Sequence, residues 1–205
     1  LADVGLVGKP NAGKSTLLSV TTAAKPKIAP YPFTTLQPNL GVVALDPSTT
    51  FVIADLPGLI EGASQGKGLG HEFLKHIERT RVLIHLVDGT ASDPLEDLEA
   101  INDELKAFGH GLIDKPQIVA VNKLDMPKAE ERFPALQETI EEMGYEVLGI
   151  SAITHEGIQE LLGRAQQLLT EAPAPEPQKE EREEPVVIRP DFSQDEGFKV
   201  GRIDE

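Results

Sequence analysis

Short apolar runs alternate with helical patterns between residues 2 and 169 of the 205-residue chain. The clearest helical pattern lies over Pro94–Phe108, where apolar residues recur every three or four positions from Leu95 to Leu105. Asp93 precedes it, and an aspartate followed by proline predicts a helix start with Asp93 as the N-cap. The other predicted helices are Lys14–Thr22, Leu69–Arg81, Pro127–Met143 and Ile158–Leu169.

The apolar runs between these helices predict strands. Strands that alternate with helices are typical of an α/β fold with a mostly parallel sheet. Two of the runs flank Asp46-Pro-Ser-Thr49, which has the composition of a turn, so we expect a hairpin that gives the sheet one antiparallel edge strand. The six predicted strands are Val4–Val7, Val42–Leu45, Phe51–Ala54, Val82–Val87, Ile118–Val121 and Glu146–Ile150.

The composition of the chain changes at Glu171. Residues 172–185 are rich in proline and glutamate and bury little apolar area, so they are predicted to form an extended linker. Val186–Ile188 and Phe198–Val200 have strand-like content but are too short to fold alone. We therefore expect an α/β domain over residues 1–170, a linker over 171–190 and the start of an incomplete region over 191–205.

Charge and composition exclude several classes of protein. The formal net charge is −15 and no run of Lys and Arg stands against it, which argues against autonomous nucleic-acid binding. The absence of cysteine excludes a disulfide scaffold and a thiolate metal site. No apolar run approaches the ~20 residues that cross a bilayer, and no basic segment of a secretory signal opens the chain. We expect a monomeric, cytoplasmic protein, and the missing initial Met indicates a fragment.

The segment after the first predicted strand matches the phosphate-loop pattern G-x-x-x-x-G-K-[ST], as Gly8-Lys9-Pro10-Asn11-Ala12-Gly13-Lys14-Ser15. It also opens a predicted helix, which is the context that the pattern requires. Glycines let backbone N–H groups curl around phosphates, and the helix N-terminus adds partial positive charge. In such a loop Lys14 reaches the β- and γ-phosphates and Ser15 ligates Mg²⁺.

Three further polar segments follow predicted strands. The carboxylate of Asp55-Leu56-Pro57-Gly58 is placed to hold Mg²⁺. The aspartate of Asn122-Lys123-Leu124-Asp125 selects guanine, because adenine lacks the donor pair that a buried carboxylate needs. Ser151-Ala152-Ile153 places a backbone N–H near guanine O6. Each segment alone is a weak signal, but ligands of open α/β sheets bind at the carboxyl ends of strands, so together the segments predict one nucleotide site.

Together with longer flanking segments, these motifs resemble the Obg (CgtA) GTPases of the translation-factor class, and the Drg and YchF relatives share parts of the pattern. The resemblance covers about residues 1–170 and rests on Tyr31–Gly41, Ala54–Ala63 and Gly68–Arg81. It implies a Ras-like P-loop NTPase with a six-stranded, mostly parallel sheet, one antiparallel edge strand and helices on both faces. It also implies a switch that binds GTP or GDP with Mg²⁺, hydrolyses GTP slowly and, in the full-length protein, acts on the large ribosomal subunit in its assembly and in stress and growth control.

The resemblance also assigns roles to residues. Lys14, Thr35 and Gly58 are expected to serve catalysis, and Ser15, Thr35 and Asp55 are the expected metal ligands. Nucleotide contacts are expected from Gly8, Lys9, Pro10, Asn11, Ala12, Gly13, Lys14, Ser15, Thr16, Phe33, Thr34, Thr35, Asp55, Leu56, Pro57, Gly58, Asn122, Lys123, Asp125, Ser151, Ala152 and Ile153.

Leu59 departs from Ras-type GTPases, which place a water-orienting glutamine after the glycine equivalent to Gly58. Leucine has no donor or acceptor, so we expect good nucleotide binding and poor intrinsic catalysis. By resemblance to potassium-activated GTPases with an asparagine in this loop position, the Asn11 side chain would help to hold a K⁺ beside Lys14 that supplies the missing positive charge. Alternatively, Asn11 only satisfies backbone groups of its own loop.

Two other classes of function stay open. A P-loop ATPase or small-molecule kinase would use the same phosphate loop, but Asn122–Asp125 argues against adenine and no acceptor-substrate domain is evident. A binding module in which nucleotide only stabilises the fold would release no phosphate under any condition. Competition between GTP and ATP, and a phosphate-release assay, distinguish these classes from a GTPase switch.

Overall fold

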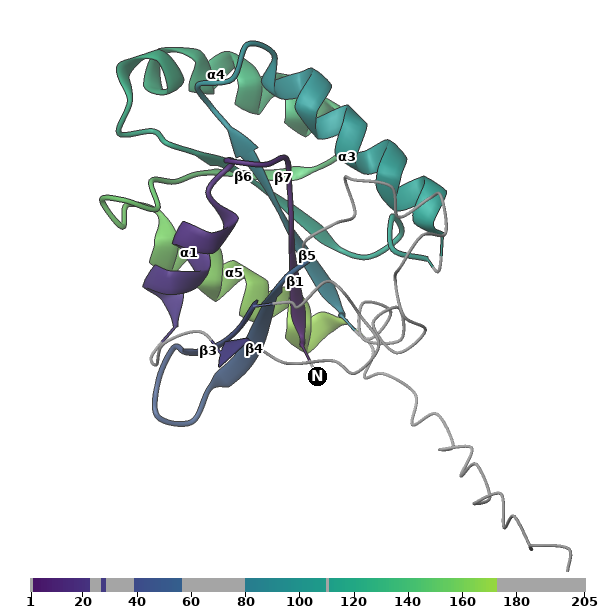
Figure 1. Cartoon of the computed structure of the whole chain (residues 1–205), viewed down its shortest axis with the longest axis vertical. Coiled ribbons are helices and arrows are strands. Elements are labelled where there is room, and N and C mark those ends of the chain that lie inside the picture. Colours follow the sequence, from purple (N-terminus) through teal and green to yellow (C-terminus); the bar gives the residue numbers. More distant parts are fainter. Residues whose placement is uncertain (1, 23–26, 29–38, 57–79, 110, 173–205) are drawn as a thin grey trace, which may run out of the picture. The chain divides into compact units, whose positions relative to one another are not determined.

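A computed structural model describes residues 2–22, 27–28, 39–56, 80–109 and 111–172 (Figure 1). The chain divides into two units, residues 1–175 and 176–205, and the second unit lies outside the described residues. The domain boundaries expected at residues 170 and 190 therefore stay predictions.

The first unit is built on one seven-stranded sheet. Its strands are β1 (Val4–Val7), β2 (Lys27–Ile28), β3 (Asn39–Ala44), β4 (Thr50–Asp55), β5 (Val82–Asp88), β6 (Gln117–Asn122) and β7 (Glu146–Gly149). They lie in the order β2-β3-β4-β1-β5-β6-β7. Strands β4, β1, β5, β6 and β7 are parallel to one another, and β3 is antiparallel to both of its neighbours.

The α/β fold with a mostly parallel sheet and a β3–β4 hairpin is confirmed. All six predicted strands are present, and the structure adds a seventh, β2, which pairs outside β3. The outermost strand at this end of the sheet is therefore β2 rather than β3. A strand of two residues is too short to show the alternation of apolar and polar positions by which strands are recognised in a sequence.

Four helices cover the sheet among the described residues, namely α1 (Lys14–Thr21), α3 (Pro94–Phe108), α4 (Pro127–Glu142) and α5 (Ile158–Glu171). Helices α1 and α5 lie on one face, and α3 and α4 lie on the other (Figure 1). The predicted cap of α3 is confirmed, because Asp93 Oδ1 accepts from the N–H groups of Leu95 at 3.1 Å and Glu96 at 3.0 Å.

The helix predicted over Leu69–Arg81 falls mostly outside the described residues, and the prediction is wrong at its end. Thr80 and Arg81 are not helical and lead directly into β5. The guanidinium of Arg81 instead caps a different helix, because its Nη2 donates to the carbonyls of Leu169 and Ala172 at the end of α5. This contact joins residues far apart in the sequence, so no local pattern announces it.

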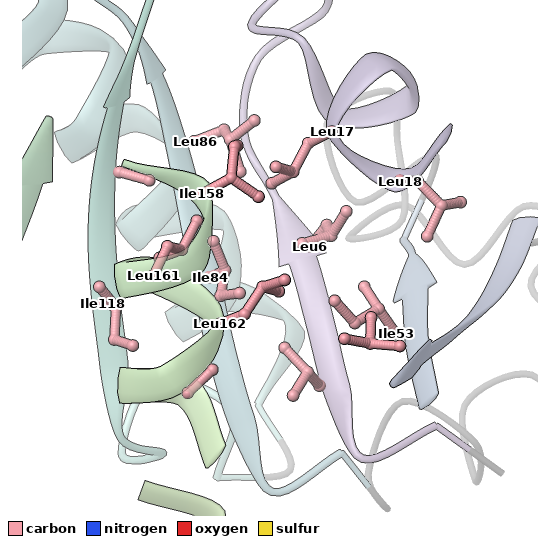
Figure 2. Packing of buried hydrophobic residues seen from close by; sticks show 14 of the residues in the cluster. Leu6, Leu17, Leu18, Ile53, Ile84, Leu86, Ile118, Ile158, Leu161 and Leu162 are labelled. Carbon is pink, nitrogen blue, oxygen red and sulfur yellow. The ribbon is translucent and has the colours of Figure 1, made fainter. Parts of the chain in front are cut away.

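The core has two layers because successive strand side chains point to opposite faces of the sheet. Leu6 and Ile84 belong to the cluster under α1 and α5, whereas Leu83 packs with residues of α3 on the other face. Figure 2 shows the first cluster, in which Leu17 of α1 and Leu161 of α5 lie over the strands. Val82–Val87 is fully buried because helices cover both faces of this central strand, and such strands have nearly continuous apolar sequences.

His85 interrupts that apolar run in the middle of β5 and is 1% exposed. Burial lowers the pKa of His85 to about 3, the nearby Gln117 amide acts in the opposite direction, and the charge of Lys14 adds to the lowering. The side chain is therefore neutral at physiological pH.

Within the described ranges, no helix is both long enough and apolar enough to cross a membrane.

Candidate nucleotide-binding site

The structure brings three strand ends and the phosphate loop to one edge of the sheet. Gly8 follows β1, Asp55 ends β4, Asn122 ends β6 and Ser151 lies two residues after β7. All four strands are parallel, so these residues lie at the same carboxyl edge, with Asp55 beside Leu6 in the register. This is the edge at which open α/β sheets bind their ligands.

Three residues with positive φ shape the phosphate loop, Gly8 at 146°, Asn11 at 65° and Gly13 at 104°. Close packing leaves no room for a side chain at two of them. A Cβ on Gly8 would lie 2.3 Å from the carbonyl oxygen of Leu86, and one on Gly13 would lie 2.2 Å from Nδ2 of Asn122. The pattern of glycines at positions 8 and 13 is therefore a steric requirement of this fold.

The loop curls around a pocket of about 280 Å³ lined by Asn11, Gly13, Lys14, Ser15 and Thr16. Gly13 stands at the N-cap of α1, and no acidic residue lies in the first turn of that helix. The free N–H groups and dipole of a helix N-terminus attract anions. The pocket therefore has the chemistry of a phosphate site.

Lys14 lies across its own loop. Its Nζ donates to the carbonyl oxygens of Gly8 at 2.7 Å and Lys9 at 3.0 Å. Burial lowers the pKa of Lys14, and the charge of Asp55 acts against that shift. A desolvated ammonium whose partners in the described ranges are neutral carbonyls gains much when phosphate oxygens approach it.

Asp55 and Ser15 supply oxygens of the kind that Mg²⁺ takes. The Ser15 hydroxyl donates to Asp55 Oδ2 at 3.2 Å, and Asp55 Oδ1 is buried without a hydrogen-bond partner in the described part of the chain. Burial raises the pKa of Asp55, whereas Lys14 and the Ser15 hydroxyl lower it. A buried carboxylate oxygen without a partner favours a cation, so the two residues fit the expected magnesium site.

At the other end of the site, Asn122 joins two segments. Its Nδ2 donates to the carbonyl of Ala12 in the phosphate loop at 2.8 Å, and its Oδ1 accepts from the N–H of Ala152 at 3.0 Å. The side chain is 2% exposed. The phosphate loop and the loop expected to bind the base are therefore held at a fixed separation by one buried amide.

Asp125 is placed by the last of the four segments. The hydroxyl of Ser151 donates to Asp125 Oδ1 at 2.7 Å and accepts from the N–H of Thr154 at 3.1 Å. Asp125 is an exposed residue, and the neighbouring Ile153 is 71% exposed. A carboxylate held in this way can accept from a pair of donors on a purine edge.

The remaining expected residues fall into two groups. The side chains of Ala12 and Leu56 are buried in the core, so only their backbones can reach a ligand, whereas Pro10 is exposed. Lys123 has a φ of 71° and pairs with Asp88. Outside the described residues lie Phe33, Thr34, Thr35, Pro57, Gly58 and Leu59.

Sequence reasoning missed Asp88, which is the last residue of β5. A signal was present, because Asp88 ends a predicted strand at the same edge as Asp55 and Asn122. Its partner Lys123 is 35 positions away, and only the strand register brings the two together.

The fold and this site define a P-loop nucleotide-binding domain, and comparisons with known proteins agree. The G domain of the T. maritima FeoB iron transporter superposes with a TM-score of 0.58 at 24% identity, covering 80% of this chain and 96% of that one. A family model described as 50S ribosome-binding GTPase matches residues 3–123, more than half of the chain. The chain therefore belongs to the 50S ribosome-binding GTPase family.

The resemblance to Obg is also confirmed. GTPase Obg of Caldicellulosiruptor saccharolyticus is 58% identical over 179 residues, which are 86% of this chain and 42% of that protein. GTPase Obg of Symbiobacterium thermophilum is 53% identical over 203 residues, 98% of this chain and 47% of that protein. The chain thus spans less than half the length of these curated relatives.

Proposed function

We propose that this chain is the nucleotide-binding part of an Obg-type GTPase switch that binds GTP or GDP with Mg²⁺ and hydrolyses GTP slowly. The observation that carries the proposal is the pair of bonds from Asn122 to Ala12 and Ala152. They hold a phosphate loop and a guanine-type loop at a fixed separation, as a single ligand with a phosphate end and a base end requires. The relatives named GTPase Obg support the same activity.

The base is read by Asp125. Its carboxylate, oriented by Ser151, accepts from the ring N–H and the exocyclic amine of guanine. Adenine would leave the carboxylate opposite a ring nitrogen without a proton, which costs a lost hydrogen bond and its desolvation. The N–H of Ala152, a candidate donor to guanine O6, donates to Asn122 in this structure.

Competition between nucleotides tests this reading. GTP and GDP should displace a fluorescent GDP from the chain, and ATP should not do so at a hundredfold higher concentration. Asp125→Asn should lose about 2–4 kcal/mol of GTP binding and gain xanthosine triphosphate, because a donor then faces the keto group at position 2. Unchanged GTP affinity in this variant would refute the assignment of Asp125.

The phosphates are held by the loop over residues 8–16. Lys14 turns from the Gly8 and Lys9 carbonyls to the β- and γ-phosphates, and the N–H groups at the start of α1 face the same oxygens. Ser15 and Asp55 hold Mg²⁺, which when bound neutralises charge on the phosphates. By resemblance, Thr35 is the third metal ligand and the backbone of Gly58 faces the γ-phosphate.

Slow turnover follows from Leu59, which cannot orient the attacking water. We propose that K⁺, held in part by Asn11, supplies positive charge beside Lys14. Asn11 supports this role because it lines the phosphate pocket with its side chain exposed.

GTP turnover should then be faster in KCl than in NaCl at equal ionic strength. Asn11→Gly, which tolerates the φ of 65°, should lose the difference while still binding GTP. Equal turnover of the parent in both salts would contradict a role for K⁺. Asn11 would then only satisfy backbone groups of its own loop.

The large ribosomal subunit is the proposed partner of the whole protein, on the strength of the matching family model. The full-length protein should sediment with isolated 50S subunits when a non-hydrolysable GTP analogue is present and much less with GDP. Equal sedimentation with both nucleotides would contradict a nucleotide-dependent switch.

A further inference from the structure

Each polar residue of the loop over residues 122–126, here called the base loop, is bonded to residues outside that loop. Asn122 bonds to the phosphate loop and to Ala152, and Asp125 bonds to Ser151. The third tie is from Lys123 to Asp88 at the end of β5. The first two lie within motifs already assigned to the nucleotide, whereas Asp88 belongs to none of them.

Both oxygens of Asp88 are used. Its Oδ2 lies 2.5 Å from Lys123 Nζ, and its Oδ1 accepts from the N–H and hydroxyl of Thr90 at 2.8 and 2.6 Å. Burial alone would raise the pKa of Asp88, but the bonds from Lys123 and Thr90 hold it below the usual value. The carboxylate is therefore charged and fully paired.

This pair is better shielded than an ordinary surface pair. The side chains of Lys123 and Asp88 are 31% and 19% exposed, against 61% and 75% for Lys106 and Asp103 on α3. Exposed pairs contribute little because water and salt screen them, and a half-buried pair keeps more of its attraction.

The backbone of the base loop needs such support. Lys123 has a φ of 71°. This backbone conformation is unfavourable for any residue other than glycine and persists only where the surroundings enforce it. The Asp88 pair acts directly on this residue. A backbone bond from Gly89 N to Asn122 O at 3.0 Å binds the same two segments one residue earlier.

The turn that carries Asp88 is itself fixed. A Cβ on Gly89 would lie 2.7 Å from the Cβ of Ala129 on α4, so the turn packs tightly against that helix. Lys128 Nζ donates to the carbonyl of Thr90 at 2.7 Å, and Arg132 Nη1 donates to that of Ala91 at 2.8 Å. The turn that carries the Asp88 carboxylate is thus held in place by its contacts with α4.

We propose that Asp88 is a positioning residue for guanine-nucleotide binding, whose ion pair with Lys123 holds the base loop in its binding conformation. The inference rests on the proposed function, because it requires that the base loop contacts a nucleotide. Asp88 does not touch the ligand and acts through Lys123 alone.

Asp88→Asn in the full chain keeps the size of the side chain and an acceptor for Thr90 but removes the charge. Release of a fluorescent GDP from a preformed complex should become about tenfold faster, a change of about 1.4 kcal/mol. Dissociation from a complex reports only on folded molecules, so partial unfolding of the variant does not enter the rate.

The matched control is Asp46→Asn in the β3–β4 hairpin. Asp46 Oδ1 accepts from the N–H and hydroxyl of Ser48 at 2.7 and 2.6 Å, which is the same turn without a lysine of the base loop. Its GDP release should stay within twofold of the parent. Asp88→Glu keeps the charge and should bring release back to within about threefold of the parent.

A double-mutant cycle separates positioning from general support. In a Lys123→Met background, which has no ammonium to pair, adding Asp88→Asn should change GDP release by less than twofold. Equal acceleration in both backgrounds, or an Asp88→Asn rate equal to that of Asp46→Asn, overturns the inference while leaving the proposed function intact. A parent chain that binds no GDP overturns the proposed function and the inference with it.

Discussion

At the base end of the proposed site, the polar side chains are bonded to other parts of the chain, whereas at the phosphate end buried charges have few partners. Asn122 bonds to the phosphate loop and to Ala152, Lys123 bonds to Asp88, and Asp125 bonds to Ser151. Within the described residues, Lys14 bonds only to carbonyls of its own loop, and one oxygen of Asp55 has no partner. Burial shifts the pKa of Lys14 down and that of Asp55 up, in each case toward the neutral form.

This difference between the two ends indicates which of them stabilises the fold and which supplies binding energy for the nucleotide. A base end already held in place loses little entropy when a ligand binds, so it contributes specificity at low cost. A phosphate end with desolvated charge lowers the stability of the empty chain and gains binding energy when the ligand neutralises it. Mutations at the two ends should therefore affect stability in opposite directions.

Lys14→Met gives the largest expected effect on binding. Removing the ammonium should weaken GTP binding by on the order of 100-fold or more, because charge-assisted bonds to phosphate are lost. The free energy of unfolding without nucleotide should stay equal or rise, since a desolvated charge is replaced by an apolar side chain of similar length. Isothermal titration calorimetry and urea unfolding measure the two quantities.

Lys106→Met on α3 is the control for the Lys14 variant, because Lys106 is 61% exposed and pairs with the exposed Asp103. It should leave both binding and unfolding within experimental error. A Lys14→Met protein that is less stable than the parent by more than about 1 kcal/mol would break the comparison, because it would show that the buried ammonium stabilises the fold.

Asn122→Ala should act in the opposite way at the base end. It leaves the carbonyl of Ala12 and the N–H of Ala152 buried without partners, so the free energy of unfolding should fall by about 2–4 kcal/mol. GTP affinity should fall as well, since the two loops lose their fixed separation. Chemical unfolding with and without GDP measures both effects.

Asn102→Ala tests whether any buried asparagine would do the same. Asn102 lies on α3 and donates one bond, to the Tyr145 hydroxyl at 3.1 Å. Its loss should cost about 1 kcal/mol and leave GDP binding unchanged. If the two alanine variants lose stability equally and both keep GDP affinity, Asn122 is an ordinary core residue. Its hydrogen bonds would then not be what holds the base end in its binding conformation.

The sequence predicted the elements well where a pattern repeats. The 15-residue helix α3 repeats its apolar positions through four turns and begins with a capping aspartate, and its bounds agree with the structure. Strand β2 has only two residues and shows no period, and the predicted helix end at Arg81 was wrong. Local patterns carry no information on a side chain that caps a helix 88 positions away.

The residues of the site could be named from the sequence, but their pairing could not. Glycine spacing identified the phosphate loop because sterics at Gly8 and Gly13 dictate it. That Asn122 braces two loops, and that Asp88 supports Lys123, depends on the order and register of parallel strands. Those are properties of tertiary structure, which short motifs do not record.

His85 is a buried histidine near the phosphate end, where the charge of Lys14 contributes to its low pKa. Its folded pKa of about 3 lies below the unfolded value of about 6.5, so unfolded molecules bind a proton that folded ones do not between these two pH values. Stability from His85 is therefore fully present above pH 6.5 and falls by about 1.4 kcal/mol per pH unit below it. His85→Gln should remove one proton from the pH dependence of unfolding between pH 6 and 4.5.

Urea unfolding at several pH values measures this slope, and the exposed His155 provides the control as His155→Gln. Carboxylates titrate in the same range in every variant, so the difference between variant and parent is the informative quantity. Identical slopes for parent and His85→Gln would show that His85 is protonated in the folded chain.

The smallest effect concerns the C-terminal end of α5. This helix follows the base-end segment Ser151–Ile153 and ends at Glu171, where Arg81 donates to the carbonyl of Leu169. The proline- and glutamate-rich composition after residue 175 predicts that a chain ending there keeps the stability and GDP affinity of the parent. A chain ending at Thr170 also loses the carbonyl of Ala172, one of the two acceptors of Arg81, and should unfold about 0.5–1.5 kcal/mol more easily. Its GDP affinity should still stay within threefold of the parent, because the ties of the base loop lie at the opposite end of the helix. A larger loss of affinity in the shorter chain would mean that the base end depends on anchoring at the end of α5 as well as on its own bonds.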